Sequence, residues 1–228
     1  LVGSPGIALG TEFFDLGSGK SHLVLTNLGI DSRTDGILLV TGGKNESANF
    51  ALAQVNTTNG GWNLFIKDEG QATTANFEQD PIAFVYIPRT NTSIISGRFL
   101  GNGAIATYSG ASPQFTVTSN AAGTYELKIV GQAATNGVLI ISPGGGETIN
   151  ADNLLNYQLN GTSDGWIIQS RDCPQAPLES PGATETVATF AFIPGPTPGF
   201  TVVPTNNLIT TEAGGTAVFT VVLDKQPF

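Results

Sequence analysis

An internal repeat limits what this chain can fold into more than any other feature of its sequence. The matching pairs are GILLVTGG (36–43) with GVLIISPGG (137–145), GWNLFIKD (61–68) with GWIIQSRD (165–172), and AFVYIP (83–88) with TFAFIP (189–194). The offset between partners grows from 101 to 104 to 106 residues, because loops absorb insertions that strands do not tolerate. The chain therefore contains two copies of a module of about 100 residues.

Toward the N-terminus the match between the copies is shorter. We align Leu23-Val24-Leu25 with Tyr125-Glu126-Leu127, Phe13 with Phe115, and Gly6-Ile7-Ala8 with Ala104-Ile105-Ala106. The second copy opens with a predicted hairpin that turns at Gly101-Asn102-Gly103, because an Asn-Gly step suits a tight turn with positive φ. On this alignment the first copy begins inside the equivalent hairpin and lacks one strand. A module without that strand has an unpaired edge, which can pair with another chain or module.

The local pattern throughout the chain is that of β-strands. Short runs rich in β-branched and aromatic residues, such as those at 82–88 and 125–130, are bounded by Gly, Asn, Asp and Pro. We predict an all-β fold of two tandem antiparallel β-sandwich modules, of the jelly-roll or immunoglobulin-like kind. The expected divisions are 1–89 for the first module, truncated at its N-terminus, 90–194 for the second, and 195–228 for a linker and a partial third module.

Composition excludes several classes of function. The 228 residues include 9 Lys+Arg and 18 Asp+Glu, for a net charge of −9, so no basic surface is available to bind nucleic acid. One histidine, His22, and one cysteine, Cys173, cannot form a His or Cys/His metal cluster. No run approaches the ~18 apolar residues that span a bilayer, so no membrane insertion is expected. No pair of carboxylates stands out as catalytic, and we expect no enzyme activity and no cofactor.

Two tryptophans occupy equivalent places, because Trp62 and Trp166 each follow a glycine at the start of a strand. In a carbohydrate-binding module these rings would lie on the surface as stacking platforms for sugars, whereas in a core they would pack between two sheets. We favour the core, because a shared core requires an apolar residue at the same place in both copies. Gly61 and Gly165 would then allow close approach of the backbone.

The strand that follows each tryptophan ends in a cation and a carboxylate, Lys67-Asp68 in one copy and Arg171-Asp172 in the other. Neighbouring residues of a strand point to opposite faces, so the two side chains cannot form a side-by-side site. We interpret Asp68 and Asp172 as caps that bind backbone N–H groups of the following turn. The two cations are expected on the solvated face.

Carboxylates are the only ligands left for a metal site. Asp31 and Asp35 before Gly36 have a faint likeness to a calcium loop, but the corresponding segment of the second copy, 132–137, has no carboxylate. A turn with Asp or Asn before Gly explains both copies. Calcium remains an option between modules, where Glu212 and Asp224 could contribute.

The last segment differs from both copies. TTEAGGTAVFTVVLDKQP at 210–227 resembles the opening strands of Calx-beta-like modules in large bacterial surface proteins. The resemblance implies a third, incomplete module of two or three strands. The alternating residues Thr216, Val218, Thr220 and Val222 are our candidates for a strand that pairs with another chain.

The duplicated units are also similar to the tandem β modules of long exported bacterial proteins, which serve as stalks, adhesins or filament components. This resemblance implies a structural or adhesive repeat region, outside the cell or at its surface. Its partners would be other copies of itself or neighbouring modules, joined by β-strand addition. The alternative is a carbohydrate-binding, lectin-like module of a secreted protein, with glycans as partners.

Overall fold

The computed structural model describes residues 12–25, 28–43, 49–58, 60–68, 77–145, 154–171, 178–179, 181–195, 200–206, 210 and 212–223. The strands of the first copy are β1 (Phe13–Gly17), β2 (Lys20–Leu23), β3 (Gly36–Gly42), β4 (Asn49–Asn56), β5 (Gly61–Asp68) and β6 (Ile82–Pro88). Those of the second are β7 (Ile95–Leu100), β8 (Ile105–Tyr108), β9 (Phe115–Ala121), β10 (Thr124–Ile129), β11 (Gly137–Pro143), β12 (Leu154–Leu159), β13 (Trp166–Arg171) and β14 (Thr186–Pro194), with a short 3-10 turn at Ala134–Asn136. β15 (Phe200–Val203) and β16 (Thr220–Leu223) follow. The predicted all-β, antiparallel fold is confirmed.

The second copy is a sandwich of two four-stranded sheets, ordered β11-β14-β7-β8 and β12-β13-β10-β9. Side chains from both sheets meet in one buried cluster that includes Phe99, Tyr125 and Phe190. The predicted hairpin joins β7 to β8: Gly103 has φ +83°, and its N–H donates to the carbonyl of Leu100 at 2.8 Å. The hairpin therefore turns at the residues that the sequence predicted, Gly101-Asn102-Gly103.

The first copy repeats this arrangement with fewer strands. Its sheet β1-β2-β5-β4 corresponds to β9-β10-β13-β12, and its sheet β3-β6 corresponds to β11-β14. In the second copy the hairpin β7–β8 continues the sheet beyond β14. Within the described part of the chain, no strand lies on the matching side of β6.

Strand register corrects the alignment of the two N-terminal strands. Leu23 lies opposite Trp62, and Leu127 lies opposite Trp166. Leu23 therefore corresponds to Leu127, and Ser21 takes the place of Tyr125. Phe13 lies opposite Leu23, and Val117 lies opposite Leu127. Phe13 therefore corresponds to Val117 rather than to Phe115. The aligned residues 6–8 lie outside the described residues.

The error was a slip of two residues in the alignment of β1 and β2. Side chains alternate between the faces of a strand with a period of two. A slip of two therefore keeps every apolar residue on the same face, whereas a slip of one would expose it. The hydrophobic pattern alone cannot detect the larger slip, and only pairing to β5 resolves it.

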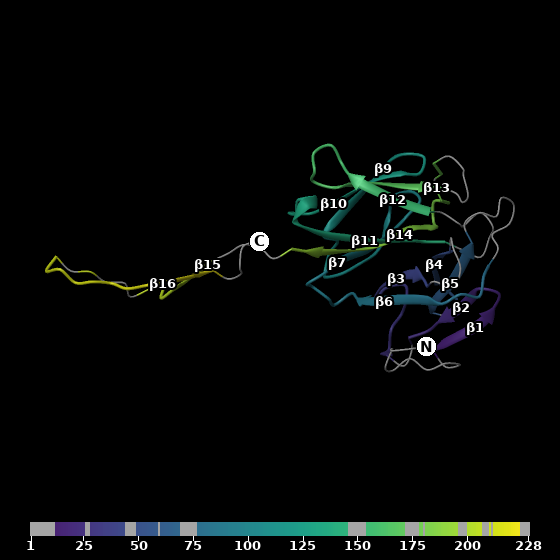
Figure 1. The fold of residues 1–228 in the computed structure, drawn as a ribbon, viewed down its shortest axis with the longest axis horizontal. Helices are drawn as coiled ribbons and strands as arrows, with labels where there is room; N and C mark the ends of the chain where they lie inside the picture. Colours follow the sequence, from purple (N-terminus) through teal and green to yellow (C-terminus); the bar gives the residue numbers. More distant parts are fainter. Residues whose placement is uncertain are drawn as a thin grey trace. The chain divides into compact units, whose positions relative to one another are not determined.

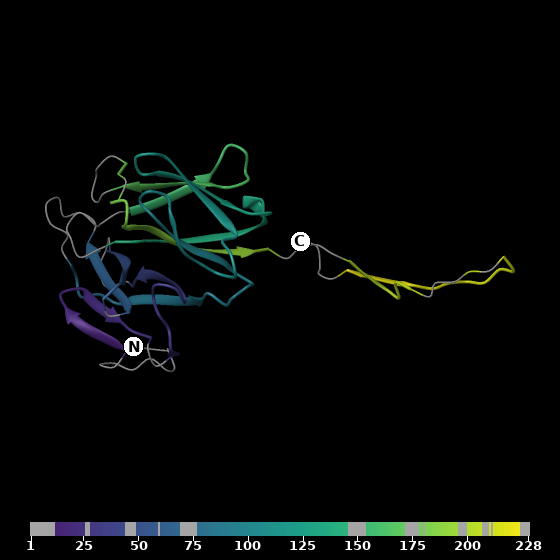
Figure 2. The same cartoon turned by 180° about the vertical axis from the view of Figure 1, so that it is seen from behind.

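The two copies stack, with the sheet β3-β6 against the sheet that contains β14 (Figure 1). Ile37, Leu39 and Ile87 of the first copy form a buried cluster with Ala191, and Ile94 packs against it. Figure 2 shows the same order of sheets from behind. Contacts group Leu1–Ile193 into one compact unit and Pro194–Phe228 into another, so the boundary near residue 89 stays a prediction.

Polar contacts close one edge of the sheet β3-β6. The Ser142 hydroxyl of β11 accepts from Val40 N–H at 3.2 Å and donates to Val40 C=O at 3.1 Å. These two backbone groups point away from β6, and the buried serine satisfies both of them. Ala53 and Gly144 form an isolated parallel bridge nearby.

The C-terminal unit contains a two-stranded antiparallel sheet, in which β15 pairs with β16 from Phe200 opposite Leu223 to Val203 opposite Thr220. Its apolar side chains are exposed: Val203, Phe219, Val221 and Val222 each expose more than half of their surface, and Val218 exposes 79%. A two-stranded sheet with open faces is at best marginally stable in water. These side chains are therefore available for a partner.

Candidate functional site

The free edge of β6 is the first component of the candidate site. β6 pairs along its whole length with β3, from Ile82 opposite Gly42 to Pro88 opposite Gly36. No other pairing to β6 occurs in the part of the chain that the structure describes. In the second copy β7 pairs with β14 at the corresponding edge, with Phe99 opposite Ala188 and Gly97 opposite Phe190. An unpaired edge offers N–H and C=O groups to an incoming strand.

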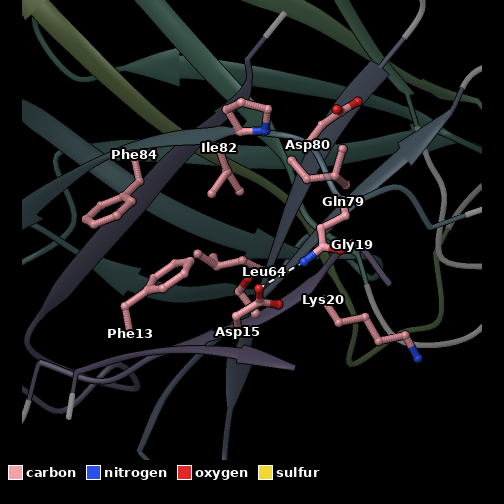
Figure 3. A pocket seen from close by; sticks show the side chains of 12 residues that line it. Phe13, Asp15, Gly19, Lys20, Leu64, Gln79, Asp80, Ile82 and Phe84 are labelled. Atoms are coloured by element: carbon pink, nitrogen blue, oxygen red, sulfur yellow. Dashed lines mark hydrogen bonds between the residues drawn. The ribbon is translucent and has the colours of Figure 1, made fainter. Parts of the chain in front are cut away.

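A cavity of about 380 Å³ opens on the inner face of β6, between this strand and the sheet β1-β2-β5 (Figure 3). Ile82 and Phe84 line it from β6, and Phe13 and Leu64 line it from the facing sheet. Its rim is polar and includes a hydrogen bond from the Gln79 amide to the Asp15 carboxylate at 3.0 Å. The interior is thus apolar and the entrance is polar.

In the second copy, two aromatic rings occupy the place that corresponds to this cavity. Phe99 of β7 and Tyr125 of β10 are fully buried there, with ring centroids 5.4 Å apart. The Tyr125 hydroxyl donates to the carbonyl of Gly101 at 3.0 Å, which ties β10 to the hairpin turn. In the first copy Ser21 replaces the tyrosine, and no described strand supplies a counterpart of Phe99. Ser21, at the place of Tyr125, and Ile82, at the place of the Ala188 that lies opposite Phe99, both line the cavity.

A second hollow, an apolar groove of about 300 Å³, lies on the outer face of β6. It is lined by Ala83 and Val85 of β6 and by Ile140 and Ile193 of the second copy. Val85, Ile140 and Ile193 expose 59%, 44% and 42% of their surfaces. The edge of β6 is therefore flanked by apolar hollows on both faces.

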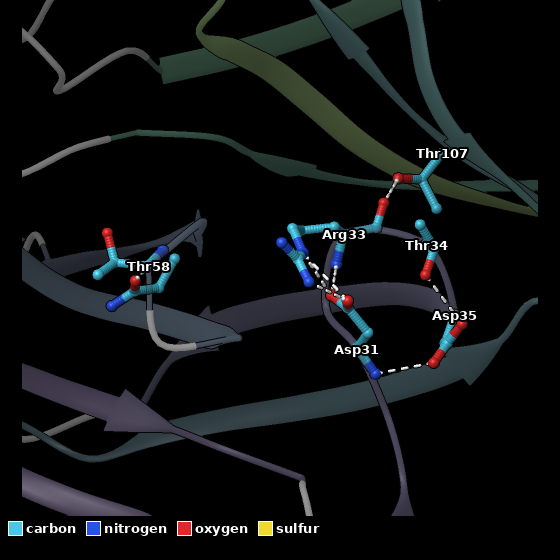
Figure 4. A network of polar contacts seen from close by, with 7 residues as sticks. Asp31, Arg33, Thr34, Asp35, Thr58 and Thr107 are labelled. Atoms are coloured by element: carbon cyan, nitrogen blue, oxygen red, sulfur yellow. Dashed lines mark hydrogen bonds and ion pairs between the residues drawn. The ribbon is translucent and has the colours of Figure 1, made fainter.

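In the predicted turn at Asp31–Asp35, both carboxylates accept hydrogen bonds from other groups of the same turn (Figure 4). Asp31 accepts from the Arg33 N–H at 2.9 Å and from the Arg33 guanidinium, whose hydrogen bonds lower the pKa of Asp31 to about 2. Asp35 accepts from Asp31 N–H at 2.8 Å and from the Thr34 hydroxyl at 2.9 Å. Thr107 of β8 donates to the Arg33 carbonyl at 3.0 Å. The loop therefore links the two copies.

For metal binding, the described residues contain no group of three or more His, Cys, Asp or Glu side chains that could hold an ion. Glu212 is exposed, and Asp224 lies outside the described residues. Calcium between modules stays a prediction.

Both tryptophans are buried, with 3% of Trp62 and 4% of Trp166 exposed. Each packs against an aromatic ring of the facing sheet, Trp62 against Tyr86 at 5.8 Å and Trp166 against Phe192 at 5.5 Å between centroids. This is the placement expected of core tryptophans. It leaves no exposed ring face for stacking on a sugar.

The cation beside the predicted cap in the first copy is not on the solvated face. Lys67 is fully buried, with its ammonium 5.3 Å from the centre of the Phe77 ring, whereas Arg171 is exposed as expected. Phe77 forms an isolated antiparallel bridge with Lys67, and this pairing places the Phe77 ring beside the lysine. The side chain of Asp68 and all of Asp172 lie outside the described residues, so their role as caps stays a prediction.

Two of the four candidate inter-chain residues lie in strand β16, and the other two precede it. Thr220 and Val222 belong to β16 and are paired with β15. Thr216 and Val218 precede β16 in a segment without assigned strand pairing, and both are exposed. The segment 215–219 is thus an exposed extension of β16.

Sequence reasoning found the open edge but missed the cavity behind it. The missing signal was Ser21, a small polar residue where the other copy has a tyrosine, and the two-residue slip in the alignment concealed it. No protein-family model, curated protein or solved structure matches this chain. Among the described residues, no helix is long and apolar enough to cross a membrane.

Proposed function

We propose that this chain is a non-catalytic structural or adhesive repeat region of an exported protein, located at the cell surface or in an extracellular filament. Its copies assemble by β-strand addition at the edge of β6. The observation that carries this proposal is the open edge with an apolar hollow on each face.

The stacking of the two copies supports the proposal. Strand β3 is buried on both faces, with Leu38 and Val40 in the core of its own copy and Ile37 and Leu39 against the second copy, so repeats of this kind pack directly on one another. Low charge, abundant Gly and the resemblance to exported repeat proteins agree with an extracellular location. The buried tryptophans remove the main argument for the glycan-binding alternative.

Analytical ultracentrifugation of the full chain over a wide concentration range tests the proposal. We expect the mean mass to rise with concentration, because strand addition follows mass action. Circular dichroism of the dissociated and associated samples should show more β-structure on association. A stably folded monomer at every concentration would contradict the proposal.

A further inference from the structure

The second copy provides a template for the strand that fits the open edge. On β14, residues Ser96–Leu100 of β7 place alternate side chains on the two faces of the sheet. Phe99 and Gly97 face the core. A Cβ on Gly97 would lie 2.2 Å from the Phe115 ring and 3.1 Å from the Phe190 ring. Of these two rings, only Phe190 has a counterpart among the described residues of the first copy, Phe84, so a residue no larger than alanine is required there. Ser96 and Arg98 face the other side of the sheet, outward from this core, where Ser96 is buried and the Arg98 guanidinium donates to the hydroxyls of Thr186 and Thr107.

The offset of 106 residues transfers this register to β6, whose Ile82 and Phe84 correspond to Ala188 and Phe190. A strand at this edge would place an aromatic residue opposite Ile82, over the cavity, and a small residue opposite Phe84. Its outward residues would lie opposite Ala83 and Val85, in the apolar groove. There an apolar side chain fits better than the arginine of β7.

One exposed segment of the chain meets these requirements. In TAVFT at 216–220, Phe219 takes the position of Phe99 and Ala217 takes the position of Gly97. Val218 replaces Arg98, which suits the apolar groove, and Thr216 replaces Ser96. Val218 exposes 79% and Phe219 56% of their surfaces. Residues 216–219 have no described strand partner, and Thr220 begins β16, which pairs with β15.

We propose that residues Thr216–Thr220 of a second copy of this chain add as an antiparallel strand to the free edge of β6, with Phe219 in the inner cavity. Val218 lies in the outer groove between β6 and the second repeat. This inference rests on the proposed function and names its donor strand. The donor and acceptor are different surfaces, so the contact is heterologous and each copy can bind one neighbour at each end. The product is an open, head-to-tail chain of copies.

Variants of exposed residues test the two surfaces separately. Phe219→Asp removes the donor, and the double variant Ala83→Asp with Val85→Asp removes the acceptor, because each places a carboxylate in an apolar hollow. Val130→Asp, at an exposed valine outside both surfaces, is the matched control for charge. Circular dichroism and thermal unfolding of each variant verify that it is folded.

Sedimentation velocity then gives the result. The wild type and Val130→Asp should form concentration-dependent oligomers, and each of the two surface variants should be monomeric. Mixed in equal amounts, the two surface variants should form a dimer and nothing larger, because one working donor meets one working acceptor. Phe219→Ala should weaken self-association on the order of 30-fold or more, the effect of losing a buried aromatic anchor.

Failure of this inference and failure of the proposed function give different results. If the wild type assembles and Phe219→Asp assembles equally well, the donor is wrong and strand addition by another segment stands. If both surface variants are monomeric but their mixture does not dimerise, the heterologous pairing is wrong. If the wild type is monomeric at every concentration, including a case in which the segment docks within its own chain, both proposals are overturned.

Discussion

At the scale of single residues, the core of each copy depends on a glycine beside a tryptophan. A Cβ on Gly61 would lie 2.2 Å from the Leu23 carbonyl oxygen, and one on Gly165 would lie 2.5 Å from that of Leu127. Real Cβ atoms do not approach backbone this closely, so the neighbouring strand would have to move. The close approach inferred from the sequence is therefore present in both copies.

We predict that Gly61→Ala and Gly165→Ala each lower the free energy of unfolding by about 1–3 kcal/mol, the usual cost of overpacking a core. Gly161→Ala is the matched control, because a Cβ at Gly161 has no atom within 4 Å. Urea unfolding followed by tryptophan fluorescence measures the difference. Equal stabilities of the control and the two core variants would contradict this account.

Tyr86 gives a prediction for alkaline pH. Burial, and then the negative charge of Asp35, raise the pKa of its phenol from about 10 to about 12, and the hydroxyl donates to the Asp35 carbonyl at 2.8 Å. Because folding raises this pKa, its stabilising effect is complete below pH 10 and is lost as pH rises toward 12. Ultraviolet titration should show a late tyrosine ionisation that belongs to Tyr86, and Tyr86→Phe should remove that step. A titration unchanged in the variant would refute the assignment.

At the scale of elements, the two edges of the sheet β3-β6 have different neighbours. The edge of β3 is closed by the hydroxyl of Ser142, which bonds both backbone groups of Val40. The edge of β6 has no such cover among the described residues. We therefore place the proposed strand addition at β6.

We expect Ser142→Ala to lower the free energy of unfolding by about 1–3 kcal/mol, because it leaves a buried N–H and C=O without their partner. The exposed Ser119→Ala should change it by less than about 0.5 kcal/mol. Chemical denaturation measures both. A Ser142→Ala protein as stable as the wild type would mean that water replaces the hydroxyl.

Element by element, the sequence predicted most of the strands and the hairpin turn at Gly101–Gly103, while the strand expected to be missing from the first copy stays a prediction. These follow from local patterns of alternation and turn residues. It predicted the wrong register for β1 and β2, because a two-residue slip preserves alternation. It also misplaced Lys67, since this lysine is bridged by Phe77, ten residues further along the chain, and local spacing carries no trace of that pairing.

At the scale of the whole molecule, the two copies share a buried interface instead of forming independently folded modules. Ile37, Leu39 and Ile87 are buried against the second copy, and contacts group Leu1–Ile193 into one unit. An exposed β3-β6 sheet would present these apolar side chains to water. Separating the copies is therefore unfavourable, and they should unfold together.

This cooperativity can be measured with the tryptophans, one in each copy. In Trp166→Phe the fluorescence reports the first copy, and in Trp62→Phe it reports the second. We predict that each variant's fluorescence transition coincides with its own unfolding curve by far-ultraviolet circular dichroism, as in two-state unfolding. Fluorescence and dichroism midpoints that differ within a variant would show that the copies unfold separately.

The amino-acid sequence by itself determined the all-β class and showed the internal repeat, because alternation, turn residues and repeats are local and can be read along the chain. The tertiary structure alone decided the stacking of the copies, the burial of Lys67 and the cavity beside Ser21. These depend on which strands face one another across a sheet, and residues far apart in the chain set that pairing. An unpaired edge was a prediction from the sequence, but the apolar hollows that suit the described edge of β6 to a partner strand exist only in the folded chain.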